Sequence, residues 1–489
     1  MTASLLGADP HVVTVGLDSF GAAPRAAGAR VTPLDWRPPA GADPALGAKL
    51  ARLTAHPLVD AANEEALRRV LDVRPLWTDV VTAREALPVL AGPERVLLHA
   101  GPPIAWERMC GPMRAAVVGA ALLEGWADTP EAAERLAASG GIAFAPCHDH
   151  DAVGPMAGIV SPSMPLLVVE DAGTGRRAYS NLNEGAGRCL RYGALGDDVL
   201  ARLRWMGERL APSLKAALHS LPEPVDLRSL TAQALQMGDE CHSRNTAASA
   251  LLLRAMAPAL ARQADLGGVE ALDFLQDNTY WFLNFSMAAA KTATLAGHGV
   301  PHSTLVTAFA RNGVEVGIRV SGGGSAWHTA PAAVVEGLYF AGYGPSDANP
   351  DIGDSAVTEV YGLGGFALAA APAIVGFVGG TPRGARATSV RMGRITVGRH
   401  RELRLPGLDF EGSPLGIDVR AVVDTGIEPV ITTGIAHREP GIGQIGAGLT
   451  HAPMECFTGA LRAFPEPEQG PGPEPEHGPE NGRERAPSV

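Results

Sequence analysis

The sequence predicts an α/β protein with a Rossmann-like N-terminal βαβ domain, a helical and mixed α+β middle, and a Gly-rich α+β C-terminal domain. Three observations lead to this prediction. Strand-like and helical segments alternate near the N-terminus, long helical patterns fill the middle of the chain, and the sequence after residue 303 is Gly-rich and strand-like. With 489 residues, of which 46% are hydrophobic and 19% charged, the chain can bury several cores.

The N-terminal residues have the pattern of one βαβ unit. Residues 12–17 (VVTVGL) and 30–37 (RVTPLDWR) are strand-like, and the segment 19–28 between them is helical. We expect the same domain to continue as a doubly wound sheet with further elements: helices at 63–71 and 77–87, a buried strand at 95–104, a helix at 106–126 and another that begins at Thr129-Pro130-Glu131.

The remaining elements divide the rest of the chain. Strand-like sequence at 158–169 and helices at 197–220, 226–263 and 269–295 are expected in the middle. The last 25 residues contain seven Pro and six Glu but no aromatic residue, so they cannot bury a core. We therefore predict four regions: a Rossmann-like domain over 1–140, a mixed α+β and helical domain over 141–300, a Gly-rich α+β domain over 301–463, and a disordered acidic Pro-rich tail over 464–489.

Composition excludes several classes of function. The net charge of −12 predicts no basic surface for nucleic acid. The five cysteines form no CxxC pair and are odd in number, which argues against a disulfide framework or a zinc knuckle and favours the reducing cytoplasm. The uncharged run 361–381 contains six Gly and one Pro and has no flanking basic anchors, so we expect a buried segment and no membrane span.

The motif CHDHD places two histidines and two aspartates side by side. In an extended segment, His148 and His150 would face away from Asp149 and Asp151, so the four groups would converge on one ion only if the chain turned. We therefore favour a metal-free substrate loop in which His148, His150 and Asp151 form hydrogen bonds or transfer protons. A divalent metal site completed from elsewhere and a solvated loop without a role are the alternatives.

The motif MGDECHSRNTA falls within a predicted long apolar helix. On helical geometry Asp239, His242 and Thr246 share one face. Asp239 would then orient His242 as a base, and Arg244 and Asn245 would hold an anionic substrate. The alternative is an internal polar network whose members satisfy only one another.

Lys291 is one of only three lysines, whereas the chain has 37 arginines. It lies on a predicted helical seam on which Asp277, Asn284, Lys291 and His298 recur every seven residues. A buried ammonium needs an anionic partner. That partner is a substrate phosphate on one hypothesis and Asp277 on the other.

The segment DANPDIGDSAVTE is similar to a calcium loop, but its Gly and its closing Glu are each displaced by one position. We therefore assign Asp351 and Asp354 to a pocket edge or to a helix cap and predict no metal ligands. The chain also contains no Walker loop, and the first βαβ unit lacks a G-x-G-x-x-G fingerprint, so no nucleotide cofactor is expected.

Two glycine clusters have the composition of anion nests, in which consecutive backbone N–H groups point at one ligand. One contains Gly322, Gly323 and Gly324, and the other surrounds His437, Arg438 and Glu439. Both are candidate substrate-binding segments, and close packing of buried glycine is the alternative for each.

Several of these motifs together resemble the AllG family. The resemblance covers residues 10–460 and is carried by GLDSF…LDWRPPA, CHDHDAVGPMAGIVSPSMP, NLNEG, GDECHSRN, DANPDIGDSAVTEVYGLGG and GIDVRAVVDTGIEPVITTGIAHREPGIGQIGAG. It implies a cytoplasmic subunit of oxamate carbamoyltransferase, which works with an FdrA-like subunit and a third small subunit. The implied reaction exchanges a carbamoyl group between oxalurate and phosphate, with oxamate and carbamoyl phosphate as products.

The predicted residues suit that reaction, which needs anion clamps, an oxyanion donor and one proton carrier but no cofactor. Arg244 or Arg438 would clamp a carboxylate, Lys291 with a glycine nest would hold phosphate, and His242 or His148 would carry the proton. The alternatives are a subunit of another acyl- or CoA-handling transferase or ligase, and a non-catalytic scaffold that completes a partner's site. Convergence of the polar clusters in one pocket would favour catalysis over the scaffold.

Overall fold

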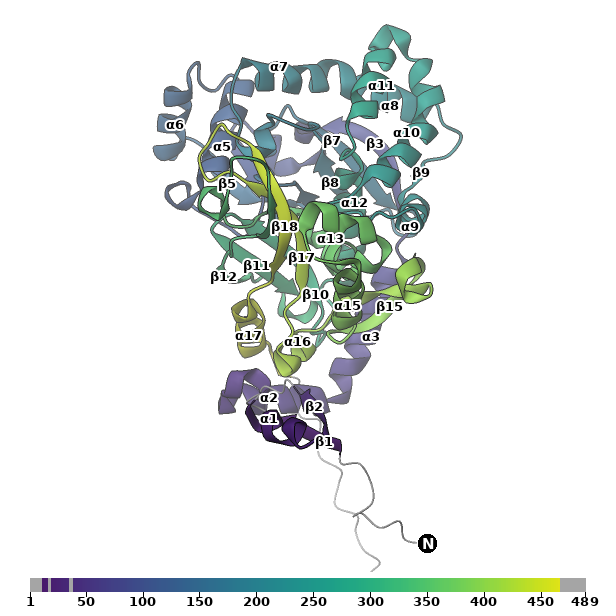
Figure 1. Ribbon diagram of the computed structural model, residues 1–489. Helices are drawn as coiled ribbons and strands as arrows, with labels where there is room; N and C mark the ends of the chain where they lie inside the picture. Colours follow the sequence, from purple (N-terminus) through teal and green to yellow (C-terminus); the bar gives the residue numbers. More distant parts are fainter. Residues whose placement is uncertain (1–10, 16–18, 35–37, 467–489) are drawn as a thin grey trace, which may run out of the picture.

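The computed structural model describes residues 11–15, 19–34 and 38–466, and shows a mixed α/β protein (Figure 1). At the N-terminal end, β1 (His11–Val15), α1 (Ser19–Ala26) and β2 (Arg30–Leu34) form a βαβ unit with parallel strands, which confirms that prediction. A larger Rossmann-like sheet is not confirmed, because within the described residues β1 and β2 pair only with each other. Most of the predicted tail lies outside the described residues.

Two helices connect this unit to the body: α2 (Pro44–Ala55) and α3 (Pro57–Asp72). Asp43 caps α2 because its carboxylate accepts the N–H groups of Ala45 and Leu46. The helix predicted at 63–71 is the second half of α3. The helix predicted at 77–87 is wrong: this segment begins within strand β3 (Pro75–Thr82) and continues as the short helix α4 (Ala83–Ala86).

Residues 77–82 form a strand and not a helix because the first side chains of β3 are buried at every second position, as in a strand. Trp77 is fully buried in the core. Strand β3 belongs to a five-stranded sheet in the order β6-β8-β7-β3-β9, whose other members are β6 (Ala152–Val153), β7 (Pro165–Asp171), β8 (Arg177–Asn181) and β9 (Val225–Asp226). The predicted strand at 95–104 exists as β4 (Val96–His99). It pairs in parallel with β5 (Ala143–Pro146) in a separate sheet, and not with β1 or β2.

Helices surround these sheets in the upper half of Figure 1: α5 (Gly111–Leu123), α6 (Pro130–Ala138), α7 (Asp197–Trp205), α8 (Ala211–His219), α9 (Leu227–Gln236), α10 (Thr246–Ala261) and α11 (Gly268–Asp277). Thr129 caps α6, as expected. A π-helical turn, Met206–Leu210, joins α7 to α8 in one continuous helix. The predicted helix over 226–263 is wrong in its middle, because residues 237–245 form a loop between α9 and α10.

The lower half of Figure 1 contains the Gly-rich C-terminal strands. One sheet has the strand order β12-β11-β10-β14 and consists of β10 (Val306–Asn312), β11 (Glu315–Val320), β12 (His328–Pro331) and β14 (Ile352–Gly353). A second sheet has the strand order β13-β18-β17 and consists of β13 (Glu336–Tyr339), β17 (Val430–Ala436) and β18 (Gln444–His451). The strands β15 (Thr396–Leu405) and β16 (Glu411–Ile417) form a hairpin in the same part of the chain. The helices of this part are α13 (Val357–Val360), α14 (Val375–Val378), α15 (Pro382–Met392), α16 (Val419–Thr425) and α17 (Met454–Ala463).

Between the two halves runs α12 (Phe282–Gly297), of which 13 of 16 residues are buried. A helix that is apolar on all faces belongs in a core, and its run of alanines allows neighbouring elements to approach closely. Residues 361–371 are also buried throughout, as predicted for that uncharged run. No helix in the described ranges is long and apolar enough to cross a membrane. One cluster of buried apolar side chains extends from Val70 to Ala436 and so crosses the predicted boundaries after residues 140 and 300. The division of the chain into these domains therefore stays a prediction.

The packing around α12 predicts how a larger side chain would affect stability. Ala290 is fully buried on α12, so Ala290→Leu should lower the free energy of unfolding by about 1–3 kcal/mol, because the added atoms have no space. Ala250→Leu, on an exposed position of α10, is the matched control and should have little effect. Urea and thermal unfolding midpoints measure both changes, and equal midpoints for the two variants would contradict the central packing of α12.

Candidate functional site

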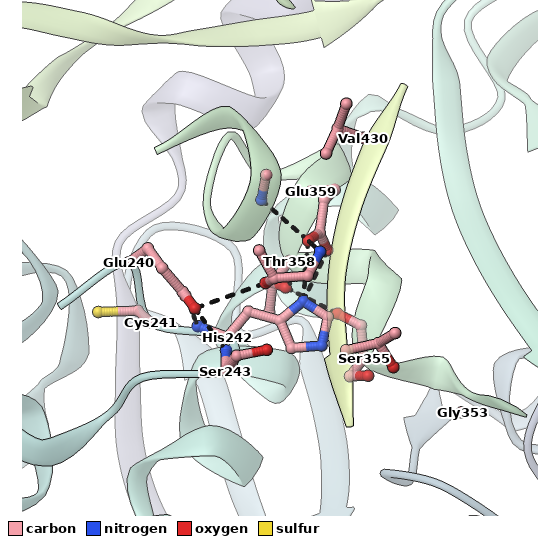
Figure 2. Close-up of polar contacts among 12 residues, drawn as sticks. Glu240, Cys241, His242, Ser243, Gly353, Ser355, Thr358, Glu359 and Val430 are labelled. Carbon is pink, nitrogen blue, oxygen red and sulfur yellow. Dashed lines mark hydrogen bonds and ion pairs between the residues drawn. The ribbon is translucent and has the colours of Figure 1, made fainter. Parts of the chain in front are cut away.

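His242 lies on the 237–245 loop, and Glu240 holds this loop in place. The Glu240 carboxylate accepts the backbone N–H groups of His242, Ser243 (2.7 Å) and Arg244 (2.9 Å) (Figure 2). Side-chain hydrogen bonds of this kind compete with helical ones, which explains why the predicted helix stops here. Glu240 is fully buried, and this burial raises the pKa of its carboxyl to about 7.

Glu359 of α13 orients the imidazole of His242. Nδ1 of His242 lies 2.8 and 3.0 Å from the two carboxylate oxygens of Glu359. The same carboxylate accepts the hydroxyl of Thr358 and the N–H groups of Gly365 and Thr432, so its position is well defined. A carboxylate beside Nδ1 keeps the proton on that nitrogen and leaves Nε2 as a proton acceptor.

The prediction that Asp239 orients His242 is therefore wrong. Asp239 accepts the N–H of Ala248 (2.8 Å) at the start of α10, and its other oxygen lies 3.4 Å from Nε of Arg244. The expected pairing assumed a helix, and in the loop the two side chains point apart. Asn245 donates to the carbonyl of His242 (2.6 Å), so it supports the loop.

His242 lines a small cavity of about 30 Å³, here called the His242 pocket. Its walls come from segments far apart in the sequence: Pro155, Met156, Arg191, Tyr192, His242, Ser243, Tyr280, Leu283, Ser355, Gly434 and Gln444. In the described part of the chain, Nε2 of His242 has no hydrogen-bond partner, and neither has the buried hydroxyl of Ser243. The pocket thus combines an oriented base with free hydroxyl groups.

An ion pair positions the segment that supplies Ser355 and Glu359. Arg311, fully buried on β10, donates Nε to Asp351 Oδ2 (2.8 Å) and Nη2 to Asp351 Oδ1 (3.0 Å). Its Nη1 donates to the carbonyl of Gly353 (2.6 Å) and to the hydroxyl of Ser355 (3.3 Å). Asp351, a predicted substrate-binding residue, is thus engaged by Arg311, and Ser355 keeps its own hydroxyl proton free to donate.

The CHDHD segment is not extended. Cys147–His150 forms a 3-10 turn, and Asp151 follows in the left-handed conformation with φ of 55°. The turn buries His148, whose Nε2 lies 3.8 Å from Asp354 Oδ1, and both of its ring nitrogens lack hydrogen-bond partners among the described residues. His150 is half-buried and Asp151 exposed, so the turn separates the predicted catalytic side chains.

Lys291 of α12 completes this second group, here called the His148 cluster (His148, Lys291 and Asp354). Its Nζ donates to the carbonyl of His148 (3.1 Å). Burial lowers the pKa of Lys291 to about 8, although Asp151 and Asp354 oppose the shift. Asp354 accepts the N–H groups of Gly101 (2.8 Å) and Gly154 (3.0 Å), and burial raises its pKa to about 7.

Asp277 is not the partner of Lys291. It is exposed at the end of α11, a separate helix, and His298 follows the end of α12, so the predicted seam is interrupted at both ends. Asn284 is on α12, but it binds side chains and backbone near β8. The negative charge around Lys291 comes instead from aspartates of the CHDHD and 351–359 segments.

Gly322, Gly323 and Gly324 lie outside the His242 pocket, whereas the second glycine cluster contributes Gly434 and Gln444 to its wall but not His437, Arg438 or Glu439. Gly322 and Gly323 belong to a turn after β11, which Gly324 ends, and Gly322 is packed against the backbone of Ser303. His437 accepts the N–H of Glu439 (2.9 Å) in the turn between β17 and β18, while Arg438 N–H donates to the carbonyl of Asp347. Arg244 donates to the carbonyl of Gly238. Substrate binding by these segments stays a prediction.

The sequence reasoning missed four polar groups of the site: Glu359, Arg191, Tyr280 and Ser355. Glu359 was noticed only as a displaced calcium-loop residue, and nothing marks Arg191 among the 37 arginines. In the described ranges, no group of three or more His, Cys, Asp or Glu side chains is arranged to hold a metal ion. The expectation of no cofactor stays a prediction.

Known proteins similar to this chain share most of its length. A family model described as "Oxamate carbamoyltransferase subunit AllG" matches residues 142–355, which include His148 and His242. The oxamate carbamoyltransferase subunit AllG of Escherichia coli (strain K12) is 49% identical over 411 residues, covering 83% of this chain and 98% of that protein.

Two further proteins extend the comparison. The uncharacterized protein YahG of Escherichia coli (strain K12) is 43% identical over 471 residues, covering 95% of this chain and 99% of that protein. A crystal structure of a conserved protein of unknown function from Enterococcus faecalis V583 superposes with a TM-score of 0.81 at 48% identity, covering 83% of this chain and 97% of that one.

The raised pKa of Asp354 predicts a dependence of stability on pH. The native state keeps the proton of this carboxyl up to about pH 7, whereas the unfolded state loses it near the ordinary pKa of 3.8. Stability from this group is therefore lost as pH rises between these values, by up to about 1.4 kcal/mol per pH unit. Asp354→Asn has no such proton to lose, so its thermal stability relative to the wild type should increase as the pH rises from about 4 to about 7.

The exposed residue Asp151 provides the control. Asp151→Asn should show the same pH profile of melting temperature as the wild type. Parallel profiles for Asp354→Asn and the wild type would mean that Asp354 is ionised in the folded protein throughout this range.

Proposed function

The chain belongs to the AllG family, and we propose that it is a subunit of an oxamate carbamoyltransferase in which the His242 pocket carries out proton transfer. The observation that carries this proposal is the oriented imidazole of His242, with Nδ1 on Glu359 and Nε2 facing the pocket. The proposed reaction converts oxalurate and phosphate to oxamate and carbamoyl phosphate. The 49% identity to a protein named for this activity supports the substrate assignment.

The reaction needs one group that both gives and takes a proton. A phosphate oxygen attacks the terminal carbonyl of oxalurate, and the bond from that carbon to the oxamate nitrogen breaks. Nε2 of His242 accepts the proton that the attacking phosphate loses and then donates it to the departing nitrogen, which would otherwise leave as an unstable anion. His242 thus returns to its starting state.

Hydroxyl groups of the pocket suit the negative charge that develops on the carbonyl oxygen. Ser243 has a buried hydroxyl without a partner among the described residues, and Ser355 accepts a bond from Arg311 and so keeps its proton for a ligand. Tyr280 also lines the pocket. Donors already in place stabilise an oxyanion without rearrangement during the reaction.

The His148 cluster is a less suitable phosphate site than the sequence suggested. The charges of Asp149 and Asp151 act on Lys291, and a phosphate dianion would be repelled by them. The glycine nest assumed beside Lys291 is not part of this cluster. We propose that the cluster instead maintains the CHDHD turn that places Pro155 and Met156 in the pocket wall.

The proposal includes a catalytic role for this chain within a larger complex in the cytoplasm, with an FdrA-like subunit and a third small subunit as partners. The polar clusters predicted from the sequence do not converge in one pocket, since His242 is the only one of their predicted catalytic residues that lines the His242 pocket. The catalytic role proposed here is therefore argued from the orientation of the His242 imidazole by Glu359, and a non-catalytic scaffold is the alternative. An acyl- or CoA-handling transferase is the alternative function.

A carbamoyl transfer assay tests the proposal. Phosphate release from carbamoyl phosphate should depend on oxamate, with the chain alone or with the protein products of its neighbouring genes. His242→Ala should lower kcat by about 10²- to 10⁴-fold, because the proton carrier is lost. Glu359→Gln should lower kcat with little change in KM, since it affects orientation and not substrate contact.

His219→Ala is the matched control, because His219 is an exposed histidine on α8 far from the pocket residues in sequence and contacts Asp79. This variant should keep full activity. Full activity of His242→Ala in the assembled complex would disprove the assignment of the proton carrier, and no oxamate-dependent release with any combination of subunits would disprove the substrate assignment.

A further inference from the structure

Arg191 is a buried cation whose charge is not balanced by a carboxylate. It lies in a 3-10 turn, Leu190–Tyr192, and is 6% exposed. Nη1 donates to the amide oxygen of Asn183 (2.6 Å) and Nη2 to the carbonyl of Gly185 (2.7 Å), both of them neutral acceptors. The neighbouring carboxylate of Glu184 accepts the backbone N–H groups of Leu190 and Arg191 instead.

The other two buried arginines with extensive hydrogen bonds are different. Arg311 binds Asp351 through two hydrogen bonds, and Arg420 binds Asp418 and Asp60. In the described residues, no carboxylate oxygen lies within 4.0 Å of the Arg191 guanidinium. The charge of Glu184 acts on Arg191 from beyond this distance and raises the pKa of Arg191, but the guanidinium itself has no direct ion pair. An anion that binds it would therefore gain a charge-assisted pair of hydrogen bonds.

Arg191 can be reached from two cavities. It forms part of the His242 pocket and also of a larger cavity of about 380 Å³, here called the Arg191 chamber. The chamber lies among α5, α7 and the π-helical turn, and most of its wall is apolar, including Leu123, Leu203 and Met206. Its volume is typical of small-ligand sites, and π turns often occur at such sites.

We propose that Arg191 binds the carboxylate of a small monocarboxylate substrate, which reaches it through the Arg191 chamber. A guanidinium matches the two oxygens of a carboxylate through two parallel hydrogen bonds. The chamber wall also carries Arg204 and the carboxylates of Glu184 and Glu208, and these carboxylates would repel a phosphate dianion more strongly than a monoanion. Bound in this way, the rest of the substrate extends into the His242 pocket, because Arg191 and His242 share that wall.

The identity of the substrate as oxamate or its N-carbamoyl derivative rests on the proposed function, but carboxylate binding by Arg191 does not. In this arrangement Arg191 takes the role that the sequence suggested for Arg244 or Arg438. Arg244 is instead engaged by Asp239 and Gly238, and Arg438 is not part of either cavity wall.

Calorimetric titration of the full chain tests the proposal. Oxamate should bind, and neutral oxamide, in which an amide replaces the carboxylate, should bind at least about 10-fold more weakly. Arg191→Met should weaken oxamate binding by about 10- to 100-fold, and Arg191→Lys should have a smaller effect because it keeps the charge but loses the planar pair of donors. Equal binding of oxamate and oxamide by the wild type would overturn the proposal without any variant.

Arg228→Met is the matched control. Arg228 is half-buried, donates to the backbone carbonyls of Leu71 and Val73 and lies 3.8 Å from Glu402, and it lines neither cavity. Oxamate binding should be unchanged in this variant. Folding of each variant is checked by circular dichroism, and a folded Arg191→Met that binds oxamate normally would overturn the role of Arg191.

Leu203→Trp tests the chamber and keeps Arg191 intact. The larger ring should fill part of the chamber and slow or weaken oxamate binding, and unchanged binding would overturn access through the chamber.

The proposed function and the carboxylate binding by Arg191 can be disproved independently of each other. Arg191-dependent binding of oxamate without any carbamoyl transfer would disprove the proposed function alone, whereas carbamoyl transfer with an unchanged KM for oxamate in Arg191→Met would disprove this inference alone.

Discussion

The ion pair between Arg311 and Asp351 is the interaction on which both polar clusters depend. Arg311 extends from β10 and also binds Gly353, Ser355 and Thr433, so one guanidinium connects two sheets to the segment 351–359. That segment supplies Asp354 to the His148 cluster, Ser355 to the His242 pocket and Glu359 to His242. A buried ion pair adds little net stability compared with apolar packing, but removal of one partner leaves a costly isolated charge. Its contribution here is to define one arrangement of the site.

Local patterns in the sequence predicted local structure well. The βαβ unit, the start of α6 at Thr129 and the burial of residues 361–371 each follow from the spacing of apolar residues or from a cap that acts within a few residues. The resemblance to the AllG family, which rests on long motifs, is confirmed by the comparisons. Motifs also identified two important segments, CHDHD and GDECHSRN, although the helix predicted through the second is a loop in the structure.

The errors have a common physical origin in contacts between residues distant in the sequence. Apolar periodicity predicted a helix through residues 237–245, but Glu240 binds three backbone N–H groups of its own loop and prevents it. The imidazole partner of His242 is 117 positions away at Glu359, whereas Asp239 is nearest in sequence. Arg191 is recognisable only because no carboxylate among the described residues pairs directly with its guanidinium, and a sequence cannot show what surrounds a side chain in space.

The π-helical turn in the α7–α8 helix has a consequence for which insertions and deletions the chain can accept. A π turn contains one more residue than a regular α-helical turn, and successive residues of an α-helix are rotated by about 100°. Because the π turn accommodates this extra residue, deletion of a single residue from Met206–Leu210 would restore regular winding and leave the direction of α8 relative to α7 unchanged. An inserted residue in the regular winding of α7 would instead rotate α8 by about 100°, and Leu214 and Leu218 would leave the core that they share with β3. The chain can thus change its length without repacking α8 at the same place where it forms the wall of the Arg191 chamber.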